Sequence, residues 1–349
     1  MTRYRLKSCV WEITLACCFS CRYCGSGAGA AREGELTTQE CASVAAQLAE
    51  LGCERVSLIG GEVFLRPDWD EIASELTGRG VRTAIITNGW LFDADTIRRI
   101  RSAGIESVAV SLDSVEPVHD GHRQRGSFRR AAAAIDALHE GGIPVSVIST
   151  LYARAAAHIA EFYEWLRTKE IFAWQIQACS PMGMAADGPD WRFDHAEILR
   201  FVASHMHEAP FAMGVADNIG YFTKEEGSLR GNLSGRAVFQ GCRAGLSAVG
   251  IDSVGNVRGC ESLYDERFNE GSLRKKTLRE IWEAPGAFAY NRDFRKELLS
   301  GKCAGCAVGA FCGGGCRSYN HFTHGKLYES LFCAREAGSK QKESMEPCR

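Results

Sequence analysis

Short apolar runs alternate with amphipathic segments along the first half of the chain. The apolar runs are predicted strands, at residues 10–15, 55–59, 82–87, 107–112, 144–150 and 173–177. The amphipathic segments between them are predicted helices, at residues 38–51, 69–78, 93–103, 128–139 and 155–169. Strands that alternate with helices form parallel sheets with right-handed crossovers. Six such units are enough for an open or a closed α/β barrel.

This alternation ends after Ser180, and the chain divides into three predicted regions, residues 1–180, 181–241 and 242–349. The middle region holds one more predicted helix, at residues 194–207, and a glycine-rich connector, at residues 220–241. The last region is rich in cysteine and glycine, and small segments of this kind usually need metal to be stable. Its charged tail after Cys333 is predicted to be frayed, with Cys348 as an exposed thiol.

Composition and charge exclude several kinds of partner. The chain has 349 residues and a net charge of −2, which provides no basic field for nucleic acid or an anionic membrane. It has no apolar run near about 18 residues and no signal peptide, so we expect no membrane span and a cytoplasmic location. The 16 cysteines therefore favour metal ligation in a reducing compartment over disulfides.

Three cysteines follow the first predicted strand. Cys17, Cys21 and Cys24 form the pattern C-x3-C-x2-C. Thiolates at this spacing can bind three irons of a cubic 4Fe–4S cluster and leave the fourth iron open. Electron-transfer ferredoxins close all four irons with cysteine. The triplet therefore predicts a redox enzyme.

Other polar motifs also fall where predicted strands end. They are Gly60-Gly61-Glu62, Thr87-Asn88-Gly89, Ser111-Leu112-Asp113, and the pair Gln175 and Gln177. Because the carboxyl ends of barrel strands carry the active site, we expect all of them to face one mouth with the triplet. The glycines let backbone approach a ligand closely. Glu62 offers a carboxylate for an ammonium group, and the hydroxyls and amides suit a ribose or a carboxylate.

The triplet with Tyr23 before its last cysteine, followed by GGE, TNG and SLD motifs, resembles the radical S-adenosylmethionine (SAM) family. The resemblance covers roughly the first half of the chain and implies a partial (β/α)6 barrel. It implies that SAM binds the open iron and is cleaved to a 5′-deoxyadenosyl radical. Val63 departs from the proline that the family often has after GGE. The implied SAM-binding residues are Gly60, Gly61 and Glu62 at the methionine amine, Asn88 and Ser111 at the carboxylate or ribose, Tyr23 at the adenine, Arg123 at a carboxylate, and Thr87, Asp113 and Gln175 beside them.

The C-terminal cysteines resemble the seven-cysteine signature of the SPASM extension of radical SAM enzymes. Cys242 is followed by Gly255 and Cys260, then by Cys303-x2-Cys306-x5-Cys312-x3-Cys316 and Cys333. The resemblance implies two auxiliary 4Fe–4S clusters, hence three clusters in all. An outer cluster would use Cys303, Cys306, Cys312 and Cys333. An inner cluster would use Cys242, Cys260 and Cys316, which leaves it with an open iron or a ligand other than a nearby cysteine.

Two further residues have competing interpretations. Cys179 follows the sixth predicted strand and is either a small buried hydrophobe or a hydrogen-atom donor or cluster ligand at the mouth. Glu261 follows Cys260 and is either a surface carboxylate or a base, the role that the resemblance to sulfatase maturases implies. We interpret His119 and His122, in a polar segment, as loop residues rather than metal ligands.

The function that this resemblance favours is modification of a ribosomally made precursor peptide by crosslinking, epimerisation or backbone excision. A reductant such as flavodoxin or ferredoxin would supply electrons. Only a few residues precede the first predicted strand, so we expect no N-terminal winged-helix domain. Recognition of the leader peptide then falls to a separate small protein or to residues 181–241. The alternatives are a dehydrogenase of a protein serine or cysteine or of a small molecule, an iron–sulfur electron carrier, and a zinc-bound scaffold.

Overall fold

The computed structural model describes residues 4–186, 190–234 and 238–335. Most of the predicted tail, with Cys348, lies outside these ranges. Within them, ten strands form one sheet in the order β10-β9-β8-β1-β2-β3-β4-β5-β6-β7. The strands are β1 Ser8–Thr14, β2 Arg55–Gly60, β3 Arg82–Thr87, β4 Ser107–Ser111, β5 Val145–Leu151, β6 Ala173–Ala178, β7 Ala212–Val215, β8 Ala248–Ile251, β9 Asn256–Arg258 and β10 Gly271–Ser272.

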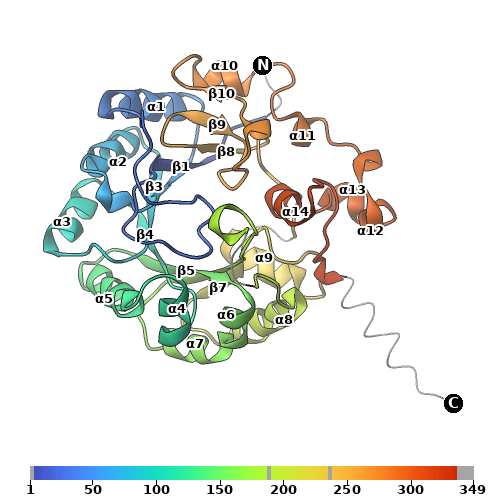
Figure 1. Cartoon of the computed structure of the whole chain (residues 1–349), viewed down its shortest axis with the longest axis horizontal. Coiled ribbons are helices and arrows are strands. Elements are labelled where there is room, and N and C mark those ends of the chain that lie inside the picture. The colour runs from blue at the N-terminus through green and yellow to red at the C-terminus, as the bar shows by residue number, and fades with distance from the viewer. Residues whose placement is uncertain (1–3, 187–189, 235–237, 336–349) are drawn as a thin grey trace.

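The helices of the first two thirds surround the curved sheet, and those after β10 lie to one side of it (Figure 1). The repeated strand–helix units confirm the α/β fold that the apolar pattern predicts. The helices are α1 Thr38–Glu50, α2 Trp69–Gly78, α3 Ala94–Ser102, α4 Glu116–His122, α5 Ser127–Glu140, α6 Ala153–Ala157, α7 Ile159–Leu166, α8 His195–His205, α9 Glu226–Ser234, α10 Leu278–Trp282, α11 Ala289–Arg292, α12 Gly301–Ala304, α13 Gly309–Cys312 and α14 Arg317–His324.

Two predicted elements are corrected by the structure. The single helix predicted at residues 155–169 is two short helices, α6 and α7. The predicted connector at residues 220–241 contains α9. The Glu226 side chain of this segment is buried, and it accepts hydrogen bonds from the Phe222 and Phe239 backbone N–H groups at 2.8 and 2.7 Å. The polar composition predicted a connector and not a helix. In the structure, the buried carboxylate instead serves as the acceptor for backbone N–H groups.

The two faces of the sheet differ in burial. Side chains on the helix-covered face, such as Trp11, Leu58 and Ile85, are 0% exposed. Most of the alternate positions are only half-buried: Ser57, Ile59, Ala84, Ile86, Ser111, Ile148, Thr150, Gln175 and Gln177. Parallel sheets normally have both faces covered. Here the inner face stays partly open to solvent at the strand ends that carry the predicted site.

The C-terminal region joins the same sheet. β8 pairs in parallel with β1, from Ser8 opposite Ala248 to Trp11 opposite Ile251. At the other edge, β7 from the predicted middle region pairs in parallel with β6. The predicted boundaries at residues 180 and 241 therefore fall within one continuous sheet, and the three-region division stays a prediction.

Candidate active site

The predicted site residues lie where neighbouring strands end. The cysteine triplet follows β1, Glu62 follows β2, and Asn88 follows β3. Hydrogen bonds connect the last two strand ends. Thr87 Oγ1 donates to Glu62 Oε1 at 2.7 Å, and the Asn88 backbone N–H donates to Glu62 Oε2 at 2.8 Å. Burial raises the pKa of the Glu62 carboxyl, and these donors oppose the shift.

Gly60 and Gly61 have a packing role that the sequence did not reveal. A Cβ added at Gly60 would lie 2.5 Å from the Thr14 carbonyl oxygen, and one added at Gly61 would lie 2.2 Å from the Ala16 carbonyl oxygen. The Gly61 and Glu62 N–H groups donate to these carbonyls at 2.8 and 2.7 Å. The glycines therefore let the end of β2 pack against the start of the triplet loop. Their contact with a ligand stays a prediction.

The triplet loop directs backbone N–H groups at two of its sulfurs. The Phe19 N–H donates to Cys17 Sγ at 3.4 Å, and the Ala28 N–H donates to Cys24 Sγ at 3.3 Å. Donors of this kind stabilise a thiolate. Burial raises the pKa of Cys21 to about 11. Without a cation this thiol is protonated, so the loop fits a positively charged iron centre.

Cys18, which belongs to neither the triplet nor the C-terminal set, also lies at this site. It is half-buried, and Asn88 Nδ2 lies 3.6 Å from its sulfur, against 3.9 Å for Cys17. A hydrogen bond shared with Cys17 lowers the pKa of Cys18 and raises that of Cys17. Its direct adjacency to Cys17 was the signal that could have identified it.

Asp113, Arg123 and Tyr23 form a buried ion pair with a bound phenol. Arg123 donates to both Asp113 oxygens, at 2.5 and 3.1 Å, and the Tyr23 hydroxyl also donates to Asp113. Asp113 is 1% exposed. Burial favours its neutral form, but the Arg123 charge and the His119 ring hold the pKa of Asp113 well below its usual range. Arg123 is thus engaged within the protein, and a contact with a ligand carboxylate stays a prediction.

The interpretation of His119 and His122 as loop residues is wrong. Both lie in α4 and are buried. His119 Nδ1 accepts a hydrogen bond from the Asp113 N–H at 3.2 Å, and His122 Nδ1 lies 2.6 Å from the Tyr152 hydroxyl. The two rings turn inward because they supply polar partners to buried groups, which a polar segment does not reveal by itself.

Gln175 lies within β6, and Cys179 directly follows this strand. Gln175 is half-buried on the inner face and pairs with Ile148 of β5. Cys179 is 1% exposed, and its N–H donates to the Leu151 carbonyl at 2.8 Å. Burial raises the pKa of Cys179 to about 12, so the thiol keeps its hydrogen at neutral pH.

The surface interpretation of Glu261 is wrong. The residue is 7% exposed, and neither carboxylate oxygen has a hydrogen-bond partner among the described residues. Burial first, and then the negative charge of Glu12, raises the pKa of Glu261 to about 8. Cys260 and Glu261 pack against β8, where a Cβ added at Gly250 would lie 2.3 Å from the Glu261 nitrogen.

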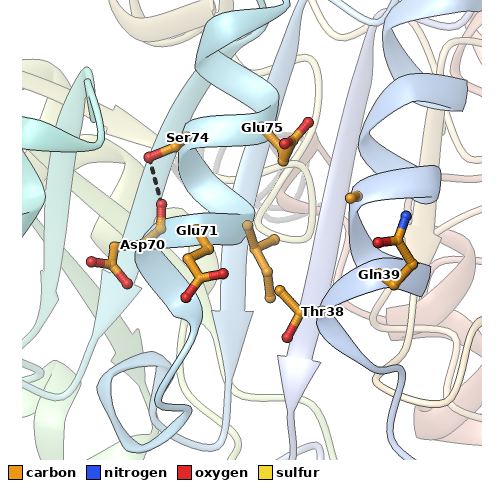
Figure 2. Close-up of a pocket in the computed structure, with 8 residues that line it drawn as sticks. Thr38, Gln39, Asp70, Glu71, Ser74 and Glu75 are labelled. Atoms are coloured by element: carbon orange, nitrogen blue, oxygen red, sulfur yellow. Dashed lines mark hydrogen bonds between the residues drawn. The ribbon is translucent and has the colours of Figure 1, made fainter.

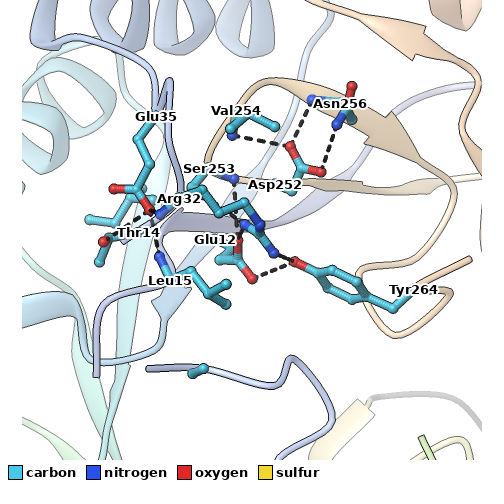
Figure 3. Close-up of polar contacts among 12 residues, drawn as sticks. Glu12, Thr14, Leu15, Arg32, Glu35, Asp252, Ser253, Val254, Asn256 and Tyr264 are labelled. Atoms are coloured by element: carbon cyan, nitrogen blue, oxygen red, sulfur yellow. Dashed lines mark hydrogen bonds and ion pairs between the residues drawn. The ribbon is translucent and has the colours of Figure 1, made fainter. Parts of the chain in front are cut away.

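A buried polar network beside Glu261 joins three distant segments (Figure 3). Arg32, from the loop after the triplet, contacts Glu12 of β1, and its other nitrogen donates to the Tyr264 hydroxyl at 2.5 Å. Ser253 adds its hydroxyl as an acceptor for Arg32 at 2.7 Å. The network ties the triplet loop to the C-terminal region. No sequence motif identified it, because its members are up to 252 residues apart.

The C-terminal cysteines form two groups. Cys303, Cys306, Cys312 and Cys333 line one small cavity, although no three His, Cys, Asp or Glu side chains in the described part of the chain are arranged around a single ion. Cys242, Cys260 and Cys316 form the second group. Burial, followed by the charge of Cys242, raises the pKa of Cys260 to about 12, and both Cys242 and Cys260 raise that of Cys316. Binding of an outer and an inner cluster by these two groups stays a prediction.

One surface groove lies away from these residues. It has a volume of about 550 Å³ and lies between α1 and α2, with Asp70, Glu71 and Glu75 on its rim (Figure 2). None of its lining residues is a predicted site residue. Among the described residues, no helix is both long and apolar enough to cross a membrane.

Comparisons with known proteins agree with this geometry. The family model of the radical SAM superfamily matches residues 11–166, and that of the SPASM iron–sulfur cluster-binding domain matches residues 242–307. The chain is 29% identical over 343 residues to the AdoMet-dependent heme synthase of Methanosarcina barkeri (strain Fusaro / DSM 804), covering 95% of this chain and 97% of that protein. It is 28% identical over 315 residues to the mycofactocin maturase MftC of Mycobacterium ulcerans (strain Agy99), covering 90% and 83%.

Solved structures with the same fold include SuiB of Streptococcus suis. The SAM-bound form superposes with a TM-score of 0.77 at 18% identity, covering 95% of this chain and 77% of SuiB. The form bound to the precursor peptide SuiA gives 0.76 at 17% identity, covering 95% and 76%. The sequence resemblance is thereby confirmed at the level of domains. The chain therefore contains a radical SAM domain followed by a SPASM iron–sulfur cluster-binding domain.

Proposed function

We propose that this protein cleaves SAM reductively and uses the resulting radical to modify a ribosomally made precursor peptide. The observation that carries the proposal is the convergence of the cysteine triplet, the Glu62–Thr87–Asn88 cluster and the Asp113–Arg123 pair at neighbouring strand ends. The inner face of the sheet is only half-buried and leaves room for a substrate beside these residues. The likeness to MftC and to peptide-bound SuiB supports a peptide substrate.

The residues present fit three 4Fe–4S clusters. Cys17, Cys21 and Cys24 would hold the SAM-binding cluster, the group that lines the small cavity would hold the outer cluster, and Cys242, Cys260 and Cys316 would hold the inner one. When bound, the first cluster and SAM would supply the 5′-deoxyadenosyl radical. We assign the SAM contacts to Tyr23, Gly60, Gly61, Glu62, Thr87, Asn88, Ser111, Asp113, Arg123 and Gln175.

Cys179 and Glu261 supply the hydrogen and proton steps of this proposal. Cys179 keeps its S–H at neutral pH because it is buried, so it can donate a hydrogen atom to a substrate radical. Glu261 has two unpartnered oxygens, and its pKa is raised to about 8, so its ionised form is a stronger base than an ordinary carboxylate and can accept a substrate proton. The two residues serve different reactions of the substrate radical. Cys179 would quench it by donating a hydrogen atom, and Glu261 would take up the proton that is lost when it is oxidised.

The partners in this proposal are the precursor peptide, a reductant such as flavodoxin or ferredoxin, and a separate leader-binding protein or the region of residues 181–241. The cytoplasm provides the reducing conditions that the thiols need. A second candidate is oxidation of a small molecule, which the likeness to the heme synthase favours.

Mass spectrometry of a co-expressed precursor peptide tests the proposal, with the Cys17→Ala/Cys21→Ala/Cys24→Ala variant as the inactive control. Loss of two hydrogens indicates crosslinking, deuterium uptake at unchanged mass indicates epimerisation, and a larger loss indicates excision. SAM cleavage that leaves every candidate peptide unchanged but consumes a porphyrin would establish the second candidate. Absence of 5′-deoxyadenosine from the reduced, iron-loaded protein would refute both.

A further inference from the structure

Tyr290 is held firmly beside the inner cysteine group. It lies in α11, which two side chains fasten to the segment after Cys242. Asn291 Nδ2 donates to the Ala244 carbonyl at 2.8 Å, and Arg292 Nε donates to the Gly245 carbonyl at 2.8 Å. The Tyr290 ring packs edge-on against Phe268 at 5.3 Å. These contacts fix the position of the phenol relative to Cys242.

The Tyr290 hydroxyl lies against Gly259, the residue before Cys260. A Cβ added at Gly259 would lie only 2.1 Å from this oxygen, so glycine is needed there to admit the phenol. Tyr290, Cys242 and Cys260 all pack against one small apolar cluster of Ala244, Leu263 and Phe268. The phenol therefore lies beside Gly259, next to Cys260 in the chain, with Cys242 in the same cluster.

The hydroxyl is buried and has no hydrogen-bond partner among the described residues. The Gly259 N–H lies near the oxygen but can only donate, so the phenol O–H still lacks an acceptor. Buried donors of this kind are almost always satisfied, because desolvation without a partner is costly. The missing acceptor is thus expected outside the polypeptide, on the side that faces Cys242 and Cys260.

We propose that the Tyr290 hydroxyl donates a hydrogen bond to a sulfur of the inner 4Fe–4S cluster and makes this cluster easier to reduce. The inference rests on the proposed function, which places a cluster on Cys242, Cys260 and Cys316. Sulfurs of such clusters carry negative charge, and hydrogen bonds to them raise the reduction potential because they stabilise the added electron. Tyr290 is a positioning residue in this scheme, since it acts on the cluster and not on substrate.

Tyr319 provides a matched control. It is 2% exposed and lies in α14, the helix that begins directly after Cys316. Its hydroxyl, however, lies 3.2 Å from His195 Nε2. Because that hydroxyl already has a partner, Tyr319→Phe removes an equal group near the cysteines without removing a bond to the cluster.

The test is an anaerobic redox titration of reconstituted full-length protein, followed by electron paramagnetic resonance. The Cys17→Ala/Cys21→Ala/Cys24→Ala background removes the first cluster's signal, and Cys242→Ala/Cys260→Ala/Cys316→Ala identifies that of the inner cluster. Tyr290→Phe should shift the inner midpoint to more negative potential and leave the outer midpoint in place. Tyr319→Phe should shift neither. An unmoved inner midpoint in Tyr290→Phe, or an equal shift in Tyr319→Phe, overturns the inference.

A donor rescue separates hydrogen bonding from packing. Replacing Tyr290 with 4-aminophenylalanine restores an N–H donor of similar size, and the inner midpoint should return toward that of the unmodified protein. If Tyr290→Phe loses the inner cluster altogether, this variant decides: a restored cluster with a restored midpoint supports the inference, and any other result overturns it. If the triple Cys242/Cys260/Cys316 variant binds as much iron as the parent, the proposed inner cluster itself is absent, and the proposed function fails at that point instead.

Discussion

The buried Asp113–Arg123 pair offers a test of how this site is held together. Asp113 is 1% exposed and the Arg123 side chain is 11% exposed. Asp113→Asn would keep the shape of the side chain but leave the Arg123 charge without a counter-charge. Removing one partner of a buried pair costs about 3–5 kcal/mol. We expect a loss of this size in the free energy of unfolding, measured by urea denaturation under anaerobic conditions.

A double-mutant cycle and an exposed pair supply the controls. Asp113→Asn combined with Arg123→Met should cost clearly less than the sum of the two single changes, because the double variant leaves no unpaired charge buried. Asp95 and Arg98 form a pair with side chains 59% and 68% exposed, and Asp95→Asn should cost less than about 1 kcal/mol. Equal losses for Asp113→Asn and Asp95→Asn, or strict additivity in the cycle, would refute the reasoning.

The same pair predicts a pH dependence. Asp113 has a pKa held well below its usual range in the folded protein, against about 3.9 in an unfolded chain. The stability from its ionisation is therefore fully present above about pH 4 and is lost as the pH falls further. The difference between the parent and Asp113→Asn in urea unfolding should shrink on acidification. A difference that grows as the pH falls would contradict this sign.

Three further changes test other parts of the structure. Gly61→Ala should lower the unfolding free energy by about 1–3 kcal/mol and reduce bound iron, because the new Cβ meets backbone atoms. The control Gly78→Ala, where nothing lies within 4 Å of the new Cβ, should do neither. A stable Gly61→Ala protein with its full iron content would contradict the packing role. Burial lowers the pKa of His195 to about 4, so stability should fall between about pH 6.5 and pH 4, by up to about 3 kcal/mol more in the parent than in His195→Gln; parallel urea-unfolding profiles would refute this. Cys179→Ser should preserve SAM cleavage but lose any product quenched by hydrogen transfer, in contrast to Cys53→Ser; retained product, measured by mass spectrometry, would exclude Cys179 as the donor.

The strand–helix core could be predicted because its signals are local. Each apolar run carries its own β-strand signal, and glycines such as Gly52 and Gly104 end the helices between them. Glu62, Thr87 and Asn88 could be placed together for the same reason, since the ends of parallel strands share one edge of the sheet. Their hydrogen bonds follow from that topology.

Long-range polar contacts could not be predicted. Glu12, Arg32 and Tyr264 meet only because β8 brings the C-terminal region to β1. The burial of Glu261 depends on the same pairing, and a single glutamate after a cysteine does not reveal it. The polar composition around α9 predicted a connector, but the Glu226 carboxylate accepts hydrogen bonds from buried backbone groups. For Glu12, Arg32, Tyr264 and Glu261, partners distant in sequence decided the outcome rather than residue type.

The position of β1 between β2 and β8 has a mechanical consequence. β1, which leads into the cysteine triplet, is hydrogen-bonded directly to β8. β8 in turn pairs with the antiparallel strand β9, which leads into Cys260. The separation between these two thiol groups is thus set by a rigid ladder and not by a hinge between two bodies. Electrons crossing that gap would meet a constant tunnelling distance.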